Sequence, residues 1–150
     1  MSTPADRPAD RPATVARWHD LVAHRDAPDV DVRLREMLAP AAVFRSPAVH
    51  RPQEGRDLTA AYLGAALVVL GPELRYEREW WDERSAVLEF VTVVGGRDLH
   101  GIDMLTWDDD GRIVDFAVMV RPLRGLETLV ELMGAELARA GAWRPAPGPG

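Results

Sequence analysis

The chain contains neither cysteine nor lysine among its 150 residues. Without cysteine it has no disulfide, no thiolate nucleophile and no Cys-ligated metal site. The 18 basic residues are all arginine, none of them gathered in a run, and the formal net charge is -6 at pH 7. Because clustered cations supply most of the affinity for nucleic acid, this charge balance argues against a nucleic-acid partner.

Long apolar runs are also missing. A transmembrane helix needs roughly 20 consecutive apolar residues, and no stretch of the sequence comes near that length. The first residues also lack the basic-then-apolar pattern of a secretory leader. We therefore expect a cytoplasmic protein with no membrane partner. Its 47% apolar content is enough for one core, which predicts a single domain.

The two ends of the chain are rich in proline, glycine and charge. Ala-Asp-Arg-Pro occurs twice in tandem between Ala5 and Pro12, and the last ten residues read Gly-Ala-Trp-Arg-Pro-Ala-Pro-Gly-Pro-Gly. Such segments bury too little apolar surface to order themselves. We interpret residues 1–13 and 141–150 as flexible tails and residues 14–140 as the folded domain.

Hydrophobic periodicity divides the domain into helices, then strands, then a closing helix. Apolar residues at helical spacing predict the helices, and Pro and Gly mark their ends. Alternation with a period of two predicts the strands. Three helices are expected to start at Thr14, Asp31 and about Asp57, and a fourth is expected over Gly125–Ala140. The expected strands are Ala42–Ser46, Leu74–Asp82, Ser85–Val94, Asp98–Trp107 and Arg112–Arg121. This order predicts an α+β fold in which a curved antiparallel sheet wraps around helices.

Both faces of the predicted strands are apolar. Val91, Met104 and Met119 lie on the face opposite to the one that holds Asp103. One small core cannot cover two faces of a sheet, and large exposed apolar patches usually mark interfaces. We therefore expect a homodimer through the second face. The alternative is that a tail or helix of the same chain covers it.

Asp103 is the one carboxylate in an otherwise apolar row of its strand. Aspartate is depleted from strand interiors, and burying its charge without a partner is costly. Asp103 is therefore expected either on a solvated face or in a functional site.

Two segments resemble the NTF2-like superfamily, which includes ketosteroid isomerases and SnoaL-like polyketide cyclases. They are Leu-Ala-Pro-Ala-Ala-Val-Phe-Arg-Ser-Pro at 38–47 and Gly-Ile-Asp-Met-Leu-Thr-Trp-Asp-Asp-Asp-Gly-Arg-Ile-Val at 101–114. The resemblance covers about residues 14–140. It implies a cone-shaped domain with a deep apolar pocket between sheet and helices, whereas the activity varies widely within such a fold.

The residues expected to line this pocket are the inward-facing ones of the strands together with aromatic residues of the helices. They are Trp18, Tyr62, Leu88, Phe90, Leu105, Trp107, Phe116, Val118 and Val120. The hydroxyls of Tyr62 and Tyr76 can reach such a pocket, although a packing role in the core is the simpler interpretation for both.

The resemblance places three residues at the catalytic positions of ketosteroid isomerases. Asp103 matches the aspartic acid of the oxyanion hole, a carboxylic acid that its apolar surroundings keep neutral. Ser46 stands where those enzymes have their aspartate base, and Trp18 where they have a donor tyrosine. A serine hydroxyl cannot take a proton from carbon without an adjacent base, and an indole N–H can donate but not ionise. These changes argue against a steroid-type double-bond shift.

Other site chemistries find less support in the sequence. Limonene epoxide hydrolases of this fold need an arginine and two aspartates in the pocket, but Leu88, Phe90 and Val118 occupy the inward positions here. His50, in a loop near the expected pocket mouth, is a candidate acid or base; the alternative is a solvated loop histidine. The histidines show no metal-ligand spacing. We expect neither a metal nor a cofactor.

The sequence thus favours a protein that binds or converts a small hydrophobic, carbonyl-bearing metabolite. As an enzyme it would be a cofactor-independent isomerase or cyclase, with Asp103 as a neutral hydrogen-bond donor to a developing enolate and His50 or Ser46 assisting. The alternative is a non-catalytic ligand carrier or a dimerisation module. The missing strong base favours that alternative.

Overall fold

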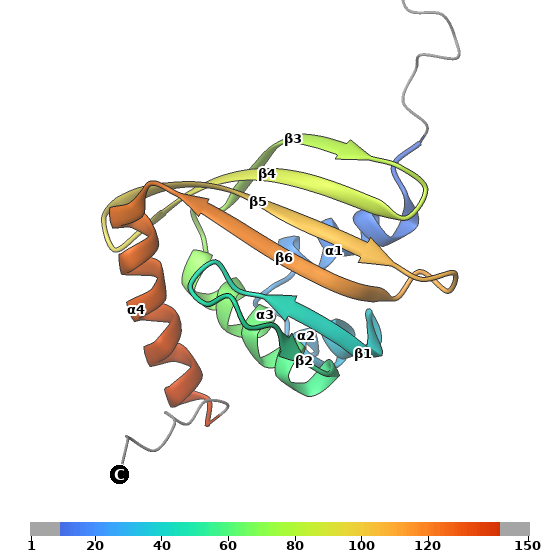
Figure 1. Ribbon diagram of the computed structural model, residues 1–150, viewed down its shortest axis with the longest axis horizontal. Coiled ribbons are helices and arrows are strands. Elements are labelled where there is room, and N and C mark those ends of the chain that lie inside the picture. The colour runs from blue at the N-terminus through green and yellow to red at the C-terminus, as the bar shows by residue number, and fades with distance from the viewer. Residues whose placement is uncertain (1–9, 142–150) are drawn as a thin grey trace, which may run out of the picture.

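The computed structural model describes residues 10–141, in which four helices and six strands follow one another (Figure 1). The predicted tails 1–13 and 141–150 fall mostly on residues outside this range. No helix of the described segment is long and apolar enough to cross a membrane. The helices are α1 (Ala13–Ala23), α2 (Val30–Glu36), α3 (Arg56–Leu70) and α4 (Leu123–Arg139), and the strands are β1 (Leu38–Arg45), β2 (Gln53–Glu54), β3 (Arg75–Trp81), β4 (Ser85–Val94), β5 (Arg97–Trp107) and β6 (Ile113–Arg121).

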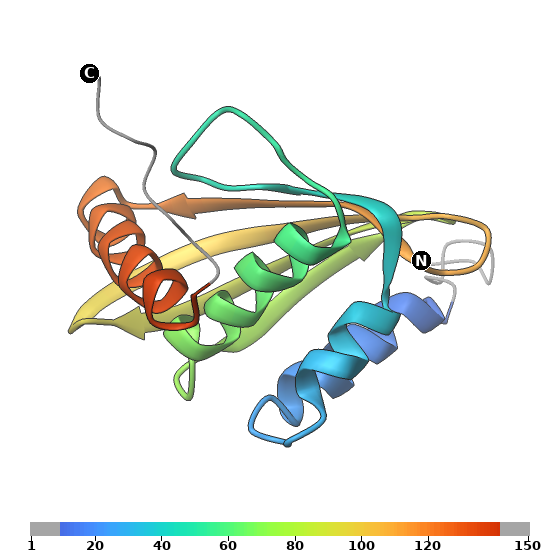
Figure 2. The same cartoon turned by 90° about the horizontal axis from the view of Figure 1, so that it is seen from below.

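The six strands form one curved sheet in the order β2-β1-β6-β5-β4-β3. Strands β3 to β6 make the antiparallel meander that the alternation predicts. The sheet as a whole is mixed instead of antiparallel, because β1 runs parallel to β6. All four helices lie on one face of it, with α4 at one end and α1 and α2 toward the other (Figure 2). This arrangement is the α+β cone expected for an NTF2-like fold.

The start of β1 departs from the predicted boundary. The strand begins at Leu38 instead of Ala42 and therefore contains Pro40. Proline removes a ladder hydrogen bond and is tolerated at bulges and edges. Its place fits this rule, because the pairing of β1 with β6 is irregular between Leu38 and Val43. The two-residue strand β2 has too little pattern to be predicted.

Two clusters of buried side chains fill the space between sheet and helices. The first includes Val15 and Leu21 of α1 and Leu105 of β5. The second includes Leu99 of β5 and Leu129 of α4. Tyr76 and Val118 pack against both clusters, so the middle of the inner face, where Asp103 lies, is where the two clusters meet.

The outer face of the sheet is less uniformly apolar than the sequence suggests. Met104 and Met119 are 38% and 55% exposed there. Between such residues lies Glu89, only 5% exposed. Its carboxylate accepts two hydrogen bonds from Arg78, at 2.6 and 2.7 Å, and lies 2.9 Å from His100 Nε2. The expected apolar face thus contains a buried carboxylate, Glu89, that is paired with the more exposed side chains of Arg78 and His100.

Candidate active site

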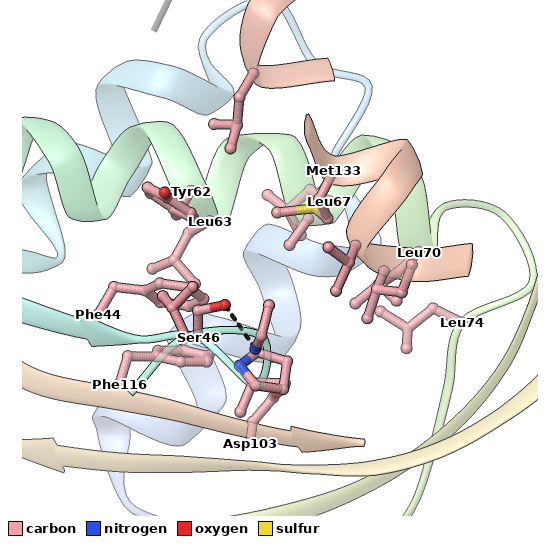
Figure 3. Close-up of a pocket in the computed structure, with 18 of the residues that line it drawn as sticks. Phe44, Ser46, Tyr62, Leu63, Leu67, Leu70, Leu74, Asp103, Phe116 and Met133 are labelled. Carbon is pink, nitrogen blue, oxygen red and sulfur yellow. Dashed lines mark hydrogen bonds between the residues drawn. The ribbon is translucent and has the colours of Figure 1, made fainter. Parts of the chain in front are cut away.

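A cavity of about 230 Å³ lies between the inner face of the sheet and helices α3 and α4. Most of its wall is apolar, with Leu63 and Leu67 from α3, Met133 from α4 and Phe116 from β6 (Figure 3). Asp103 enters from the sheet side and is the only carboxylate among the described residues that line the cavity. The volume falls somewhat below the roughly 300–1,000 Å³ typical of small-molecule pockets.

Asp103 is part of a chain of three polar side chains. The Tyr76 hydroxyl lies 2.5 Å from Asp103 Oδ2, and Trp18 Nε1 donates to the Tyr76 oxygen at 2.9 Å. These residues come from β5, β3 and α1, and all three line the cavity. The cavity therefore has one polar end, built by three separate elements, in an otherwise apolar wall.

Local backbone features bring Tyr76 to Asp103. The pairing of β3 with β4 shifts register between Tyr76 and Glu79, so that both residues oppose inward-facing positions of β4. Beside them, the Phe90 ring lies against Gly101, where a Cβ atom would approach it within 2.6 Å. Since any larger residue at Gly101 would push this ring away, the glycine allows Phe90 to pack against β5 near Asp103.

Burial controls the protonation of this pair. Asp103 is 4% exposed, and loss of solvation raises its pKa from 3.8 to about 7, against the opposing effect of the Tyr76 hydrogen bond. Burial and the nearby Asp103 charge raise the pKa of Tyr76 well above its usual 10. Tyr76 is thus a neutral phenol at physiological pH, while both forms of Asp103 are populated near neutrality.

Several of the residues predicted from the sequence meet at this cavity. Trp18, Ser46, Tyr62, Phe116 and Val118 line it together with Asp103. Ser46 Oγ accepts a hydrogen bond from the Ala48 backbone N–H at 3.0 Å (Figure 3). Ser46 can therefore donate its own proton to a ligand, although no base among residues 10–141 lies beside it to make the hydroxyl a nucleophile.

Five predicted lining residues do not border the cavity, and these predictions are wrong. Leu88, Leu105 and Trp107 are buried in the first core cluster, which α1 and α2 cover. Phe90 and Val120 pack in the second cluster with Leu129 of α4. All five face inward as alternation requires. The helices fill the space above them, so only the middle of the face borders a cavity.

His50 does not support its predicted role as an acid or base. It is exposed and is absent from the cavity lining. The loop between β1 and β2, which carries it, extends away from the sheet (Figure 2). Ser46, at the start of the same loop, remains at the cavity.

The contact of Tyr76 with Asp103 and most of the wall from α3 and α4 are parts of the site that the sequence did not predict. For Tyr76 the sequence left open a hydroxyl that reaches the pocket, with a packing role in the core as the simpler interpretation, and the structure has the hydroxyl at the cavity. The register shift in β3 that turns the side chain to Asp103 leaves no clear mark in the sequence. The inward stripe of α4 was the available signal for Leu129 and Met133, since those positions have helical spacing.

A second group of titratable residues lies behind the Tyr76 ring, outside the cavity. His19 contacts Tyr76 edge to face, with ring centroids 4.9 Å apart, and its Nε2 pairs with Glu79. Arg11 approaches Glu79 at 3.1 Å. Burial lowers the pKa of His19 despite the carboxylate. Within residues 10–141 no group of three His, Asp or Glu side chains is arranged to hold a metal ion.

Comparison with known proteins places this architecture in a family. No protein-family model matches the sequence, and no curated protein matches it either. Solved structures do: a steroid delta-isomerase from Pseudomonas aeruginosa is 48% identical, with a TM-score of 0.79 over 87% of this chain and 93% of that one.

Two further structures extend the comparison. A protein with a cystatin-like fold from Silicibacter pomeroyi DSS-3 is 32% identical, with a TM-score of 0.78 over 86% of this chain and 88% of its own. An NTF2-like protein from Mesorhizobium loti, 21% identical, has a TM-score of 0.62 over 77% of this chain and 98% of its own, which shows a shared fold. With its cone of curved sheet and helices and these relatives, the chain belongs to the NTF2-like superfamily.

Proposed function

We propose that the protein binds a small apolar molecule with a carbonyl oxygen and isomerises or cyclises it without a cofactor. The observation that carries this proposal is the Tyr76–Asp103 pair at the single polar end of an apolar cavity. A ligand oxygen placed there meets hydrogen-bond donors, and the hydrocarbon part fills the rest.

Asp103 in its neutral form is the proposed donor to the oxygen as negative charge develops on it. Burial favours this neutral form because it raises the pKa to about 7. A fixed donor in a water-poor site stabilises an enolate more than the same donor would in water. The Pseudomonas aeruginosa relative is named as a steroid delta-isomerase, which supports a reaction of this class. Ser46 is proposed to assist as a second donor.

The binding part is tested with a pair of compounds that differ only in the carbonyl group. We expect 2-tetralone to raise the melting temperature through mass action, and tetralin, the hydrocarbon without the oxygen, to raise it less. Asp103→Ala should remove this difference between the two compounds. Equal shifts with 2-tetralone and tetralin in the unmodified protein would contradict a polar end that recognises oxygen.

A second candidate function is that of a non-catalytic carrier. It is favoured by the makeup of the wall, since Asp103 is the only carboxylate and no histidine is found among the described lining residues. A carrier would bind ketones without changing them. Turnover of a bound ketone separates the two candidates.

We also propose that a second copy of the chain covers the outer face of the sheet. Met104 and Met119, with Val93 at 42% exposure, present apolar surface there. Such a patch on a small domain is typical of a subunit interface. The Glu89 cluster in its middle is already neutralised by Arg78 and His100, so its carboxylate would not enter the interface unpaired.

A further inference from the structure

The cavity contains only one group that can accept a proton from carbon. Its ionisable residues within the described chain are Tyr62, Tyr76 and Asp103. Both tyrosines have a raised pKa and are neutral phenols near pH 7. Ser46 has no base beside it, and His50 lies outside the lining. Among the described side chains of the lining, the Asp103 carboxylate is therefore the one that can take a proton from a ligand.

We infer that Asp103 is the base of the reaction and that Tyr76 is the donor coupled to it. This inference rests on the proposed function, because it requires a ketone with its oxygen at the polar end. The Asp103 carboxylate removes a proton from the carbon beside the carbonyl. The electrons of that C–H bond form a C=C bond, and the carbonyl π electrons move to the oxygen. Asp103 becomes neutral and the ligand becomes an enolate.

The hydrogen bond between the two side chains couples these events. The Tyr76 hydroxyl has one proton, which it gives to the Asp103 carboxylate across 2.5 Å. Once Asp103 has taken a proton its oxygen is a weaker acceptor, so the Tyr76 proton turns to the enolate oxygen. Asp103, now neutral, returns its proton to the same carbon or, in a ketone with a C=C bond beside that carbon, to the far carbon of the conjugated enolate. The second outcome is an isomerisation in which all atoms and electrons balance.

Trp18 is a positioning residue in this scheme. Its N–H donates to the Tyr76 oxygen at 2.9 Å and occupies one lone pair. The indole cannot accept the Tyr76 proton, so that proton has only Asp103 or a ligand oxygen as its partner. The Tyr76 hydroxyl is thereby restricted to the two positions that the reaction uses.

The surroundings of Asp103 make its titration easy to interpret. Within the part of the chain that the structure describes, Tyr76 is the one titratable group in contact with it. Beyond the Tyr76 ring lie His19 and Arg11, which both pair with Glu79. Helix α4 and strand β6 bring only uncharged side chains to the cavity, and α3 brings only uncharged ones besides the neutral phenol of Tyr62.

The test is the exchange of protons beside the carbonyl of 2-tetralone for deuterium, followed by NMR in D2O at saturating protein. We expect a rate that rises with pH through about 7, because the carboxylate is the active form. Asp103→Asn should lower the rate by about a hundredfold or more, while the affinity for 2-tetralone changes by less than about threefold. Asp109→Asn, in the exposed turn before β6, is the matched control and should leave exchange unchanged.

Tyr76→Phe provides a readout that a purely structural role would not give. Tyr76 stabilises the Asp103 carboxylate by its hydrogen bond, so without it the rise of the rate should move to higher pH. The maximal rate should also fall, because the enolate loses its donor. A profile that keeps its midpoint in Tyr76→Phe would overturn the coupling.

The outcomes also separate this inference from the proposed function. A rate that falls as pH rises through about 7 would mean that neutral Asp103 is the active form; the inference is then wrong and the proposed function stands. A ketone that binds but does not exchange overturns the inference in favour of the carrier. If no ketone binds, the proposed function fails, and the inference with it.

Discussion

Asp103 and Glu89 are buried carboxyls on neighbouring strands of one sheet, yet their pKa values are shifted in opposite directions. Asp103 faces inward and is 4% exposed; Glu89 faces outward and is 5% exposed. The pKa of Asp103 is about 7 and that of Glu89 about 2. Similar burial therefore does not determine the charge state of either group.

The partners of the two groups explain the difference. Glu89 receives two hydrogen bonds from the Arg78 guanidinium and pairs with His100, which favours its charged form. Asp103 has a single neutral partner, Tyr76, whose hydrogen bond only partly offsets the loss of solvation. One face of the sheet thus contains a permanently charged cluster, and the other contains a carboxyl that can change protonation at neutral pH.

We expect the largest effect from placing a cation beside Asp103, as Arg78 lies beside Glu89. Val118 lies directly opposite Asp103 on β6 and lines the cavity. In Val118→Arg the guanidinium should lower the pKa of Asp103 well below 7 and fill the ligand space, so that affinity for 2-tetralone falls by about a hundredfold or more. NMR titration of Asp103 and thermal shifts measure both effects. Val118→Leu is the control, and tight binding by a folded Val118→Arg protein would contradict the location of the site.

The next effect concerns what covers the outer face. If a second copy covers it, Met104→Glu places an unpaired charge in the interface and should weaken the dimer by about a hundredfold. Sedimentation at micromolar concentration measures the change. Val68→Glu, on an exposed position of α3 away from this face, changes the same kind of residue and should leave the dimer intact. A monomeric parent protein would remove the proposed interface.

The inner and outer faces also differ in how far the sequence predicts them. In the three strands that became β4, β5 and β6, alternation assigned the residues to their faces, and it placed Asp103 inside and His100 outside, as the structure has them. It could not tell which inward residues border space and which lie under a helix. That is why Leu88 and Trp107 were wrongly expected at the cavity: their surroundings depend on where α1 and α2 pack, which is a long-range property.

Two further features of the sheet cannot be predicted from local sequence patterns. The parallel pairing of β1 with β6 joins segments about seventy positions apart, as the Arg45–Asp115 contact illustrates, and periodicity within either strand says nothing of its partner. The register shift in β3 that turns Tyr76 inward is a single-residue change in pairing. The resemblance of 38–47 and 101–114 to a family predicted the fold where such local patterns could not.

Removing Arg78, the strongest partner of Glu89, should have a moderate effect on stability. In Arg78→Met, Glu89 keeps only His100, so the pKa of Glu89 should rise and the melting temperature should fall by several degrees at neutral pH. Arg45→Met is the matched control, because Arg45 pairs with the more exposed Asp115 on the same face, where ion pairs contribute little. Equal decreases in melting temperature in the two variants would mean that the Glu89 cluster behaves as an ordinary surface ion pair.

The smallest effect, and the one with the clearest sign, is expected from making the inner group permanently neutral. The folded-state pKa of Asp103, about 7, lies above its ordinary 3.8, so its contribution to stability is fully present below the unfolded pKa and is lost as pH rises through about 7. Asp103→Asn cannot acquire the buried charge. Its melting temperature should match that of the parent at about pH 3, below the unfolded pKa, and exceed it by an increasing amount, a few degrees at about pH 9, as pH rises through the folded pKa. Glu89→Gln should instead be less stable than the parent from about pH 5 to about pH 9, because the lowered pKa of Glu89, about 2, means that its carboxylate stabilises the fold at neutral pH and loses this effect only as pH falls through that value. Thermal melts of both variants across this pH range decide the matter: if Asp103→Asn is less stable than the parent in alkali, then Asp103 is a stabilising carboxylate like Glu89, and the contrast between the two faces is wrong.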